Sequence, residues 1–251
     1  GSIMSTAKVA LRSLSDPLLR DVSAGSQVDF MELRRRPTVL FISYNVEDIE
    51  YLKFYLSIFW TQLMTSFTKV PAHDSSILPI YCQMDEFQNL GRIPGMEQSI
   101  ATLRKFRVSL FLFIQGLAGL HQYGKAAKII EGNCKTKLFT GGLDYDDCKY
   151  VSNMLGKATI RYNSPNSSDL SREERLKDTR EMSRSLLEAE EVRQLPPDQI
   201  IMFHGAAKPA LLGLNPYYQD KELMKFVDLP LTGSVDYMTN RVPIKYVNIG
   251  P

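Results

Sequence analysis

Apolar residues recur at helical spacing through one long segment of the chain. From Ile49 to Phe67 they return every three or four residues, and further apolar positions widen the stripe. A stripe of this period is typical of a helix with one buried face, and we therefore predict a helix over residues 46–67. Glu47 and Asp48 fall in its first turn, where the helix dipole favours negative charge.

Shorter apolar runs without this period predict strands. The runs are residues 37–44, 77–84, 108–114, 136–140 and 158–162. Helical segments are expected between them at residues 96–106, near residues 125–131 and from Asp144 onward. Strands that alternate with helices and carry apolar side chains on both faces are typical of parallel sheets that helices cover on both sides. The pattern predicts an α/β domain with a doubly wound, largely parallel sheet.

The ends of the chain and one internal segment lack this alternation. Residues 1–4 begin with Gly-Ser and suggest a tag remnant, a helix-like stretch follows at residues 7–19, and residues 229–251 are expected to form a tail. Residues 163–184 are polar and of mixed charge, which predicts an exposed excursion that is partly helical. A short capped helix and a strand are predicted within residues 185–205.

Composition narrows the classes of function. The chain has 251 residues, 44% of them apolar, and its 30 basic and 28 acidic residues leave a net charge of +2, which by itself demands neither nucleic acid nor an anionic membrane. The three cysteines lack CxxC spacing and the three histidines are scattered, so neither a disulfide framework nor a zinc site is readable and a reducing cytoplasm is expected. The longest apolar run, residues 108–120, is too short to cross a bilayer core of about 30 Å.

Two adjacent carboxylates, Asp85 and Glu86, follow the apolar run that ends at Met84. Open α/β sheets bind ligands at the carboxyl ends of their strands. In nucleotide hydrolases with this layout, the first acid helps to hold Mg²⁺ and the second orients or deprotonates the attacking water. Two acids that merely end a strand and cap the next turn have the same appearance, so the pair alone leaves both interpretations open.

A glutamine, Gln115, ends the next apolar run, where an adjacent strand would place it beside Asp85 and Glu86. A glutamine there can sense a γ-phosphate, although an amide that caps a strand end and bonds to backbone is an equal alternative. The phosphate-cradling motif G-x-x-x-x-G-K-[ST] occurs nowhere in the chain. The string "MLGKAT", residues 154–159, has a Gly-Lys but neither the earlier glycine nor the following Ser or Thr.

Several unusual strings occur together in this chain: "DEFQNLGRIPGMEQSIATLRKFRVSLFLFIQ", "LHQYGKAAKIIEGNCKTKLFTGG" and "LLEAEEVRQLPPDQIIMFHG". In this order they resemble the TraG/TraD-like coupling proteins of type IV secretion and conjugative DNA transfer, over residues 5–228. The resemblance implies a RecA-like P-loop NTPase fold that lacks the P-loop strand in this chain. It also implies an ATP-dependent motor, hexameric and membrane-anchored, that recruits a relaxase bound to single-stranded DNA and feeds it to the secretion channel at the cytoplasmic face of the bacterial inner membrane.

The resemblance implies roles for four residues. Asp85 would lie on the Mg²⁺ side, through water, Glu86 would be the catalytic base, Gln115 the γ-phosphate sensor, and Arg104 an arginine finger that reaches a neighbouring subunit's nucleotide. Without the resemblance, Arg104 would be one of several basic residues at a helix end, where they complement the dipole. Two positions depart from the family pattern: Gln83 interrupts the apolar Walker B strand, and Gly116 stands where serine often follows the glutamine.

The family's membrane helices and P-loop strand precede the matched region, so we expect this chain to be the C-terminal part of a motor domain and a soluble piece. It should need the P-loop segment to use ATP and Mg²⁺, and should not hydrolyse ATP alone. A catalytically incomplete module that docks relaxase, DNA or secretion-channel components is the alternative. Candidate DNA contacts are Arg34 with Arg35 and Arg36, and the cluster of Arg104, Lys105 and Arg107, all of which also fit a solvated charged surface.

The missing P-loop strand has a consequence for the sheet. In RecA-like sheets this strand lies between the strands predicted here at residues 108–114 and 136–140. Without it, each of these strands should lack a neighbour on one side and expose unpaired backbone groups.

Overall fold

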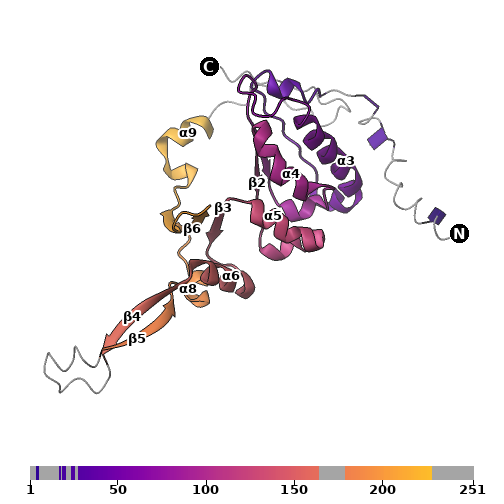
Figure 1. Ribbon diagram of the computed structural model, residues 1–251. Coiled ribbons are helices and arrows are strands. Elements are labelled where there is room, and N and C mark those ends of the chain that lie inside the picture. Colours follow the sequence, from indigo (N-terminus) through magenta and orange to yellow (C-terminus); the bar gives the residue numbers. More distant parts are fainter. Residues whose placement is uncertain are drawn as a thin grey trace. The chain divides into compact units, whose positions relative to one another are not determined.

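The computed structural model describes residues 28–163 and 179–227, with short pieces at residues 4–5, 17, 19–20 and 24–25. The chain divides into two compact units, of which unit 1 is described up to Cys134 and unit 2 covers Lys135–Pro230 (Figure 1). The helix-like stretch expected at residues 7–19 lies largely outside the described residues, and the tail at 229–251 lies entirely outside them.

Unit 1 contains one long helix, a pair of strands and several short helices. In chain order its elements are η2 (Glu32–Arg34), η3 (Val46–Asp48), α3 (Ile49–Phe67), β1 (Ile80–Met84), η4 (Phe87–Leu90), α4 (Met96–Thr102), η5 (Leu103–Phe106), β2 (Val108–Leu112), η6 (Leu117–Ala126) and α5 (Ala127–Asn133), where η denotes a 3₁₀ helix. The long helix predicted at residues 46–67 is confirmed as η3 followed by α3. Both strands are somewhat shorter than predicted.

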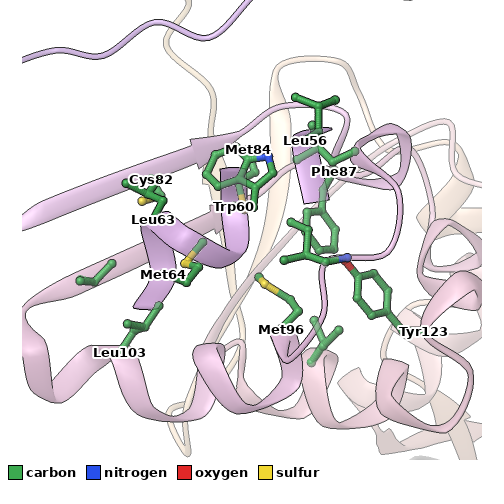
Figure 2. Packing of buried hydrophobic residues seen from close by; sticks show 14 of the residues in the cluster. Leu56, Trp60, Leu63, Met64, Cys82, Met84, Phe87, Met96, Leu103 and Tyr123 are labelled. Atoms are coloured by element: carbon green, nitrogen blue, oxygen red, sulfur yellow. The ribbon is translucent and has the colours of Figure 1, made fainter. Parts of the chain in front are cut away.

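The core of unit 1 lies between α3 and one face of the strand pair (Figure 2). The apolar stripe of α3 supplies Trp60, Leu63 and Met64, and alternate residues of β1 supply Cys82 and Met84, all of them buried. Each large apolar side chain removed from water in this way stabilises the fold by about 1.5–3 kcal/mol. The apolar stripe of α3 and the alternate apolar residues of the strands therefore pack in one cluster, and this cluster anchors the ends of both strands.

Strands β1 and β2 are parallel, with Ile80 opposite Val108 and Met84 opposite Leu112. Only one face of this pair meets the core, because Tyr81 and Phe111 on the other face are 64% and 45% exposed. Among the described strands β2 has no neighbour besides β1. The parallel sheet with helices is thus present, and in this unit its described part consists of two strands.

The strand predicted at residues 37–44 is wrong, since residues 37–45 have no regular structure. None of the described strands pairs with this segment, and its side chains at Val39 and Phe41 are 51% and 88% exposed. Apolar and β-branched residues favour a pleated surface only when a neighbouring strand accepts their backbone hydrogen bonds. The sequence has the composition of a strand here, but no described strand pairs with it.

Unit 2 is built differently. Its elements are β3 (Thr136–Thr140), α6 (Tyr145–Leu155), β4 (Lys157–Asn163), β5 (Thr179–Ser185), α8 (Ala189–Arg193), β6 (Gln199–His204), β7 (Ala210–Gly213), η8 (Tyr217–Gln219) and α9 (Lys221–Val227). Strands β3, β6 and β7 form an antiparallel sheet in that order.

The pairing of β3 differs from the expectation of one parallel sheet. β3 runs antiparallel to β6, with Thr136 opposite His204 and Thr140 opposite Ile200. A buried apolar run has the same appearance in a parallel and in an antiparallel sheet, so the alternation of strands and helices could not reveal this partner. β3 lies at the edge of its sheet, and in the described residues it pairs only with β6.

Local caps define the helices of unit 2. The Asp144 side chain accepts a hydrogen bond of 2.8 Å from the Asp147 backbone N–H, so the helix predicted to open at Asp144 is confirmed as α6. Glu188 and Glu191 form a reciprocal capping box at the start of α8. Such caps satisfy N–H groups that have no partner within the helix.

Strands β4 and β5 form a separate two-stranded antiparallel ribbon that extends beyond α6 and α8 (Figure 1). The predicted excursion at residues 163–184 therefore ends in strand, since Thr179–Ser185 is β5, rather than in helix. Residues 164–178 lie outside the described residues. No helix in the described ranges has both the length and the apolar character needed to cross a membrane.

Candidate functional site

The parallel register of β1 and β2 brings the predicted acid pair and glutamine together. Beyond the strands the two segments stay bonded, because the Phe113 N–H donates to the Met84 carbonyl at 3.1 Å and the Phe87 N–H donates to the Phe113 carbonyl at 2.9 Å. Gln115 follows two residues later, and its Nε2 lies 3.5 Å from Oε1 of Glu86. The structure thus places Glu86 and Gln115 side by side on an exposed surface.

The backbone turns sharply at the acid pair. Oδ1 of Asp85 accepts a hydrogen bond of 3.0 Å from the Glu86 N–H. Glu86 has φ 44° and ψ 48°, in the left-handed region, which costs a non-glycine residue about 1–2 kcal/mol. Backbone strain of this kind is concentrated at functional sites, where surrounding structure maintains it.

The buried residue after the pair supplies that support. The Phe87 side chain is fully buried, and its ring stacks on Tyr123 with 5.6 Å between ring centroids. The Tyr123 hydroxyl in turn accepts a hydrogen bond of 3.2 Å from the Ile93 N–H. The turn that presents Glu86 is therefore anchored in the core of unit 1.

Asn89 is a site residue that we did not predict from the sequence. Its Nδ2 donates to Oε2 of Glu86 at 2.6 Å, and its backbone N–H donates to the Glu86 carbonyl at 2.7 Å. A carboxylate followed three residues later by a carboxamide in "DEFQN" is the signal that could have suggested this contact.

Tyr44 is the second residue that the sequence did not reveal. Burial, followed by the negative charges of Glu86 and Asp85, raises the pKa of the Tyr44 phenol. Tyr44 stands at the end of the segment predicted as a strand and packs against the core of unit 1.

The site offers oxygen ligands for a metal ion, but few of them. The described residues contain no group of three or more His, Cys, Asp or Glu side chains placed to hold a metal. Mg²⁺ is commonly bound through one or two carboxylates, with water and substrate phosphates completing the octahedron. The exposed carboxylate of Asp85 fits that use, whereas a cation that requires a cage of protein ligands would not be held here.

Arg104 lies at the opposite end of the strand pair from the acid residues. It belongs to η5, directly before β2, and is exposed. The Arg107 carbonyl, at the same end, accepts from the Ile80 N–H at 2.9 Å, so the length of β1, at about 3.3 Å per residue, separates Arg104 from Glu86. Within one chain Arg104 and the acid pair are not brought together.

The three consecutive arginines have different environments. Arg34 is only 3% exposed, and its guanidinium donates to the carbonyls of Phe106 at 2.8 Å and Leu78 at 3.1 Å while it stacks over the Phe67 ring. Arg35 and Arg36 are exposed and form ion pairs with Glu32. The candidate DNA contact at Arg34 is therefore corrected, because its charged group is buried and serves to join separate segments of unit 1.

The basic cluster near η5 is also partly structural. Nη1 of Arg107 donates to the carbonyls of Ser75 at 2.6 Å and Ile77 at 2.8 Å. Lys105 and Arg104 remain exposed. A DNA backbone would therefore find only part of this cluster available.

Comparison with known proteins identifies relatives. A family model described as "Type IV secretory system Conjugative DNA transfer" matches residues 1–240. The chain is 24% identical over 217 residues to protein VirD4 of Rhizobium radiobacter and 23% identical over 217 residues to VirD4 of Agrobacterium fabrum. Each alignment covers 85% of this chain and 31% or 32% of the relative, so the chain spans about a third of the length of these curated relatives.

Solved structures of the coupling protein TrwB show the same fold. An unbound form has a TM-score of 0.57 at 16% sequence identity, and a complex with the ATP analogue ADPNP has a TM-score of 0.56 at 19% identity. Each match covers 70% of this chain and 40% of the TrwB chain. This likeness confirms the predicted fold class, RecA-like and mixed α/β with a parallel sheet and helices.

Proposed function

The chain belongs to the type IV secretory system conjugative DNA transfer family, and from this premise we propose that it supplies the water-activating side of an ATP-driven motor. The motor recruits relaxase-bound single-stranded DNA, or a protein substrate, and moves it toward the secretion channel. The chain is similar to coupling proteins over most of its length, which supports the coupling role. The motor activity, the substrates and the partners of this chain are our proposal.

The contact between Glu86 and Gln115 carries this proposal. It joins two polar side chains from neighbouring parallel strands, at the edge where open α/β sheets bind ligands. In the proposed reaction Glu86 accepts the proton of a water molecule as that water attacks the γ-phosphate, and Gln115 donates to the γ-phosphate or to the water. Asp85 would hold Mg²⁺ through a water molecule.

Nucleotide and metal binding need groups that this chain does not supply by itself. TrwB has been solved with ADPNP and with ADP and Mg²⁺, which supports ATP and Mg²⁺ as the cofactors of the proposed motor. Held through Asp85, Mg²⁺ would supply neutralisation of the negative charge on the phosphates. Because G-x-x-x-x-G-K-[ST] is absent from the 251 residues, the phosphate cradle has to come from a separate P-loop segment, and the chain alone should not turn over ATP.

Arg104 is proposed to act between subunits. It is exposed and lies away from Glu86 of its own chain, so a contribution to hydrolysis requires a neighbouring copy. In a ring, proposed to be a hexamer, it would stabilise the transition-state charge of the adjacent subunit's nucleotide. The proposed location of the motor is the cytoplasmic face of the inner membrane.

The deciding experiment replaces Glu86 by Gln in a version of the protein that carries the P-loop segment. We expect ATP affinity to change less than about threefold and hydrolysis to fall by about two to four orders of magnitude, because only water activation is lost. Glu222→Gln is the matched control, since Glu222 is an exposed glutamate of unit 2 that pairs with Lys225. If Glu86→Gln leaves the rate of hydrolysis unchanged, Glu86 has no catalytic part and only ends the strand.

A catalytically incomplete docking module is the second candidate, and the absent P-loop motif favours it. Such a module would bind relaxase, DNA or a secretion-channel component without nucleotide. The discriminating observation is whether the chain restores ATP hydrolysis when a P-loop segment from the same gene or operon is joined to it. Restoration supports the motor, and failure with intact nucleotide binding supports the docking module.

A further inference from the structure

The two carboxylate oxygens of Glu86 are held unequally. Oε2 receives a short hydrogen bond of 2.6 Å from Nδ2 of Asn89, whereas among the residues that the structure describes Oε1 has only the long contact of 3.5 Å from Nε2 of Gln115. Hydrogen bonds between N–H groups and oxygen are commonly 2.7–3.2 Å long and weaken beyond that range. Oε2 is thus engaged, and Oε1 remains able to accept another donor.

The backbone around this contact is held by a hydrogen bond and by a buried side chain. The Asn89 N–H closes the turn on the Glu86 carbonyl at 2.7 Å. Between them, Phe87 is fully buried and stacked on Tyr123. Moving the backbone of Glu86 or Asn89 would displace the buried side chain of Phe87, so the distance between the two residues is set by the fold of unit 1.

We propose that Asn89 is a positioning residue that holds Oε2 of Glu86 and presents Oε1 to the attacking water. This inference rests on the proposed function, because it assigns Asn89 a part in the same reaction. During hydrolysis the water proton passes to Oε1, and the water oxygen bonds to the γ-phosphorus as the bond from that phosphorus to the β–γ bridging oxygen breaks and ADP leaves with that oxygen. Asn89 keeps its own protons and only orients the carboxylate. A carboxylate at the end of a flexible side chain gains most from such restraint, since a misplacement of about 1 Å can lower a rate about 100-fold.

If Asn89 served only to close the turn, replacing its side chain would have little effect on Glu86. The turn is closed by the backbone N–H of Asn89, and this bond survives replacement of the side chain by Ala. The side-chain amide is therefore separable from the turn, and its loss should affect Glu86 rather than the fold.

The first test uses the chain itself without nucleotide. In a ¹⁵N-labelled sample, the side-chain amide signal of Asn89, assigned by its disappearance in Asn89→Asp, should move when Glu86 is replaced by Gln. The amide of Asn215, which donates to Asp220 at 3.0 Å in unit 2, is the internal control and should not move. An Asn89 amide that does not respond to Glu86→Gln would overturn the proposal.

The second test measures hydrolysis in the protein that carries the P-loop segment. Asn89→Ala should lower kcat about 10- to 100-fold with KM and ATP affinity nearly unchanged, and Asn89→Asp should lower it further, because a second carboxylate repels Glu86. Added to Glu86→Gln, Asn89→Ala should have no further effect, since residues that act through one group are not additive. Asn215→Ala, which removes a similar bond in unit 2, should retain the normal rate.

The outcomes separate this inference from the proposed function. If Glu86→Gln leaves hydrolysis unchanged, the proposed function fails. If Glu86→Gln abolishes hydrolysis but Asn89→Ala and Asn89→Asp leave kcat unchanged, only the positioning role fails. A fall in kcat that is accompanied by a lower thermal stability in both Asn89 variants would also overturn it, because the residue would then support the fold.

Discussion

The two compact units differ in how much apolar surface they bury. Among the described residues, unit 1 has a single cluster of sixteen buried hydrophobic residues that extends from α3 to α5, whereas unit 2 has a cluster of five. Unit 2 also carries the β4–β5 ribbon, on which Ile160 and Met182 face each other and are 36% and 48% exposed. A two-stranded ribbon of this kind is marginally stable without further packing.

This difference explains where the candidate site is built. Asp85, Glu86, Asn89 and Gln115 all belong to unit 1, and their turn is anchored by its core. A strained backbone persists only where surrounding structure maintains it, and the larger cluster provides that support. We expect unit 2 to open more readily, because local stability follows the number of buried apolar contacts.

The largest expected effect comes from removing the core anchor of the site. Phe87→Ala should destabilise unit 1 by about 3–5 kcal/mol, since Phe87 is fully buried and its replacement leaves a cavity. Val192→Ala, at an equally buried position of unit 2, should cost about 1–3 kcal/mol and affect unit 2.

Thiol labelling can resolve the two units in this experiment. Cys82 in unit 1 and Cys148 in unit 2 are both buried, so the rate at which each is alkylated, measured by peptide mass spectrometry, reports the opening of its own unit. Faster labelling of Cys82 alone in Phe87→Ala would show that unit 1 opens independently of unit 2. Equal acceleration at both cysteines would show that the units open together.

The next effect concerns the buried arginine of unit 1. Arg34→Met should destabilise unit 1 by about 2–4 kcal/mol, because the carbonyls of Leu78 and Phe106 lose a charged donor while remaining inside the fold. Arg35→Met is the matched control, since its ion pair with Glu32 is exposed, and it should change stability by less than about 0.5 kcal/mol. Urea titration followed by labelling of Cys82 measures both. Similar midpoints for the two variants would contradict the structural role of Arg34.

Alkaline pH should weaken unit 1 through a buried thiol. Burial raises the pKa of Cys82 from 9.0 to about 11, an effect that the charge of Arg34 partly offsets. Between these values the unfolded chain has lost the proton that the folded chain retains, so stability should fall as pH rises from about 9 to about 11, by about 2–3 kcal/mol in total.

The variant Cys82→Ala, which lacks the buried thiol, is the control for that pH dependence. Urea titrations at several pH values should show a shallower alkaline decline for Cys82→Ala than for the unmodified chain. Burial also raises the pKa of Cys148, with the charge of Asp144 as the next cause, so unit 2 should respond in the same direction. An identical decline in Cys82→Ala would assign the alkaline sensitivity to other groups.

The smallest expected effect is a gain in stability at the site itself. Asn tolerates the left-handed region better than Glu, so Glu86→Asn should stabilise unit 1 by about 0.5–1 kcal/mol at φ 44°. The same change removes the proposed base, and hydrolysis by the P-loop-bearing protein should be lost. Calorimetry on Glu86→Asn and Glu86→Gln separates the effects, since Gln retains the strain. A loss of stability in Glu86→Asn would show that the Glu86 side chain supports the fold.

Much of the fold was predictable because it depends on local pattern. The apolar stripe from Ile49 to Phe67 is a helix, Asp144 caps α6, and the runs before Asp85 and Gln115 are the parallel strands β1 and β2. The acid pair was predicted to stand at a strand end and does so. In each case the helix, cap or strand end is defined by residues within one short sequence, whereas the parallel pairing of β1 with β2 was expected from the alternation of strands and helices.

Other features depended on contacts between distant segments. The run at residues 37–44 resembles a strand but has no described strand beside it, and β3 pairs antiparallel with β6 across more than fifty residues. Arg34 resembles its neighbours in sequence, yet it donates to carbonyls 44 and 72 residues away. No period or motif within a segment specifies which other segment will meet it.

The sequence by itself determined the helical and extended segments, the family and the position of two carboxylates at the end of a strand, because these follow from local spacing and from motif residues. The sequence also placed Gln115 beside Glu86, but only the tertiary structure decided how the two oxygens of Glu86 are divided, with Oε2 bonded to Asn89 and Oε1 facing Gln115. It also decided that the anchored turn has a left-handed residue at its start. The physical reason is that side-chain orientation and backbone strain are set by burial of Phe87 and by strand pairing, both of which join parts of the chain that the sequence keeps apart.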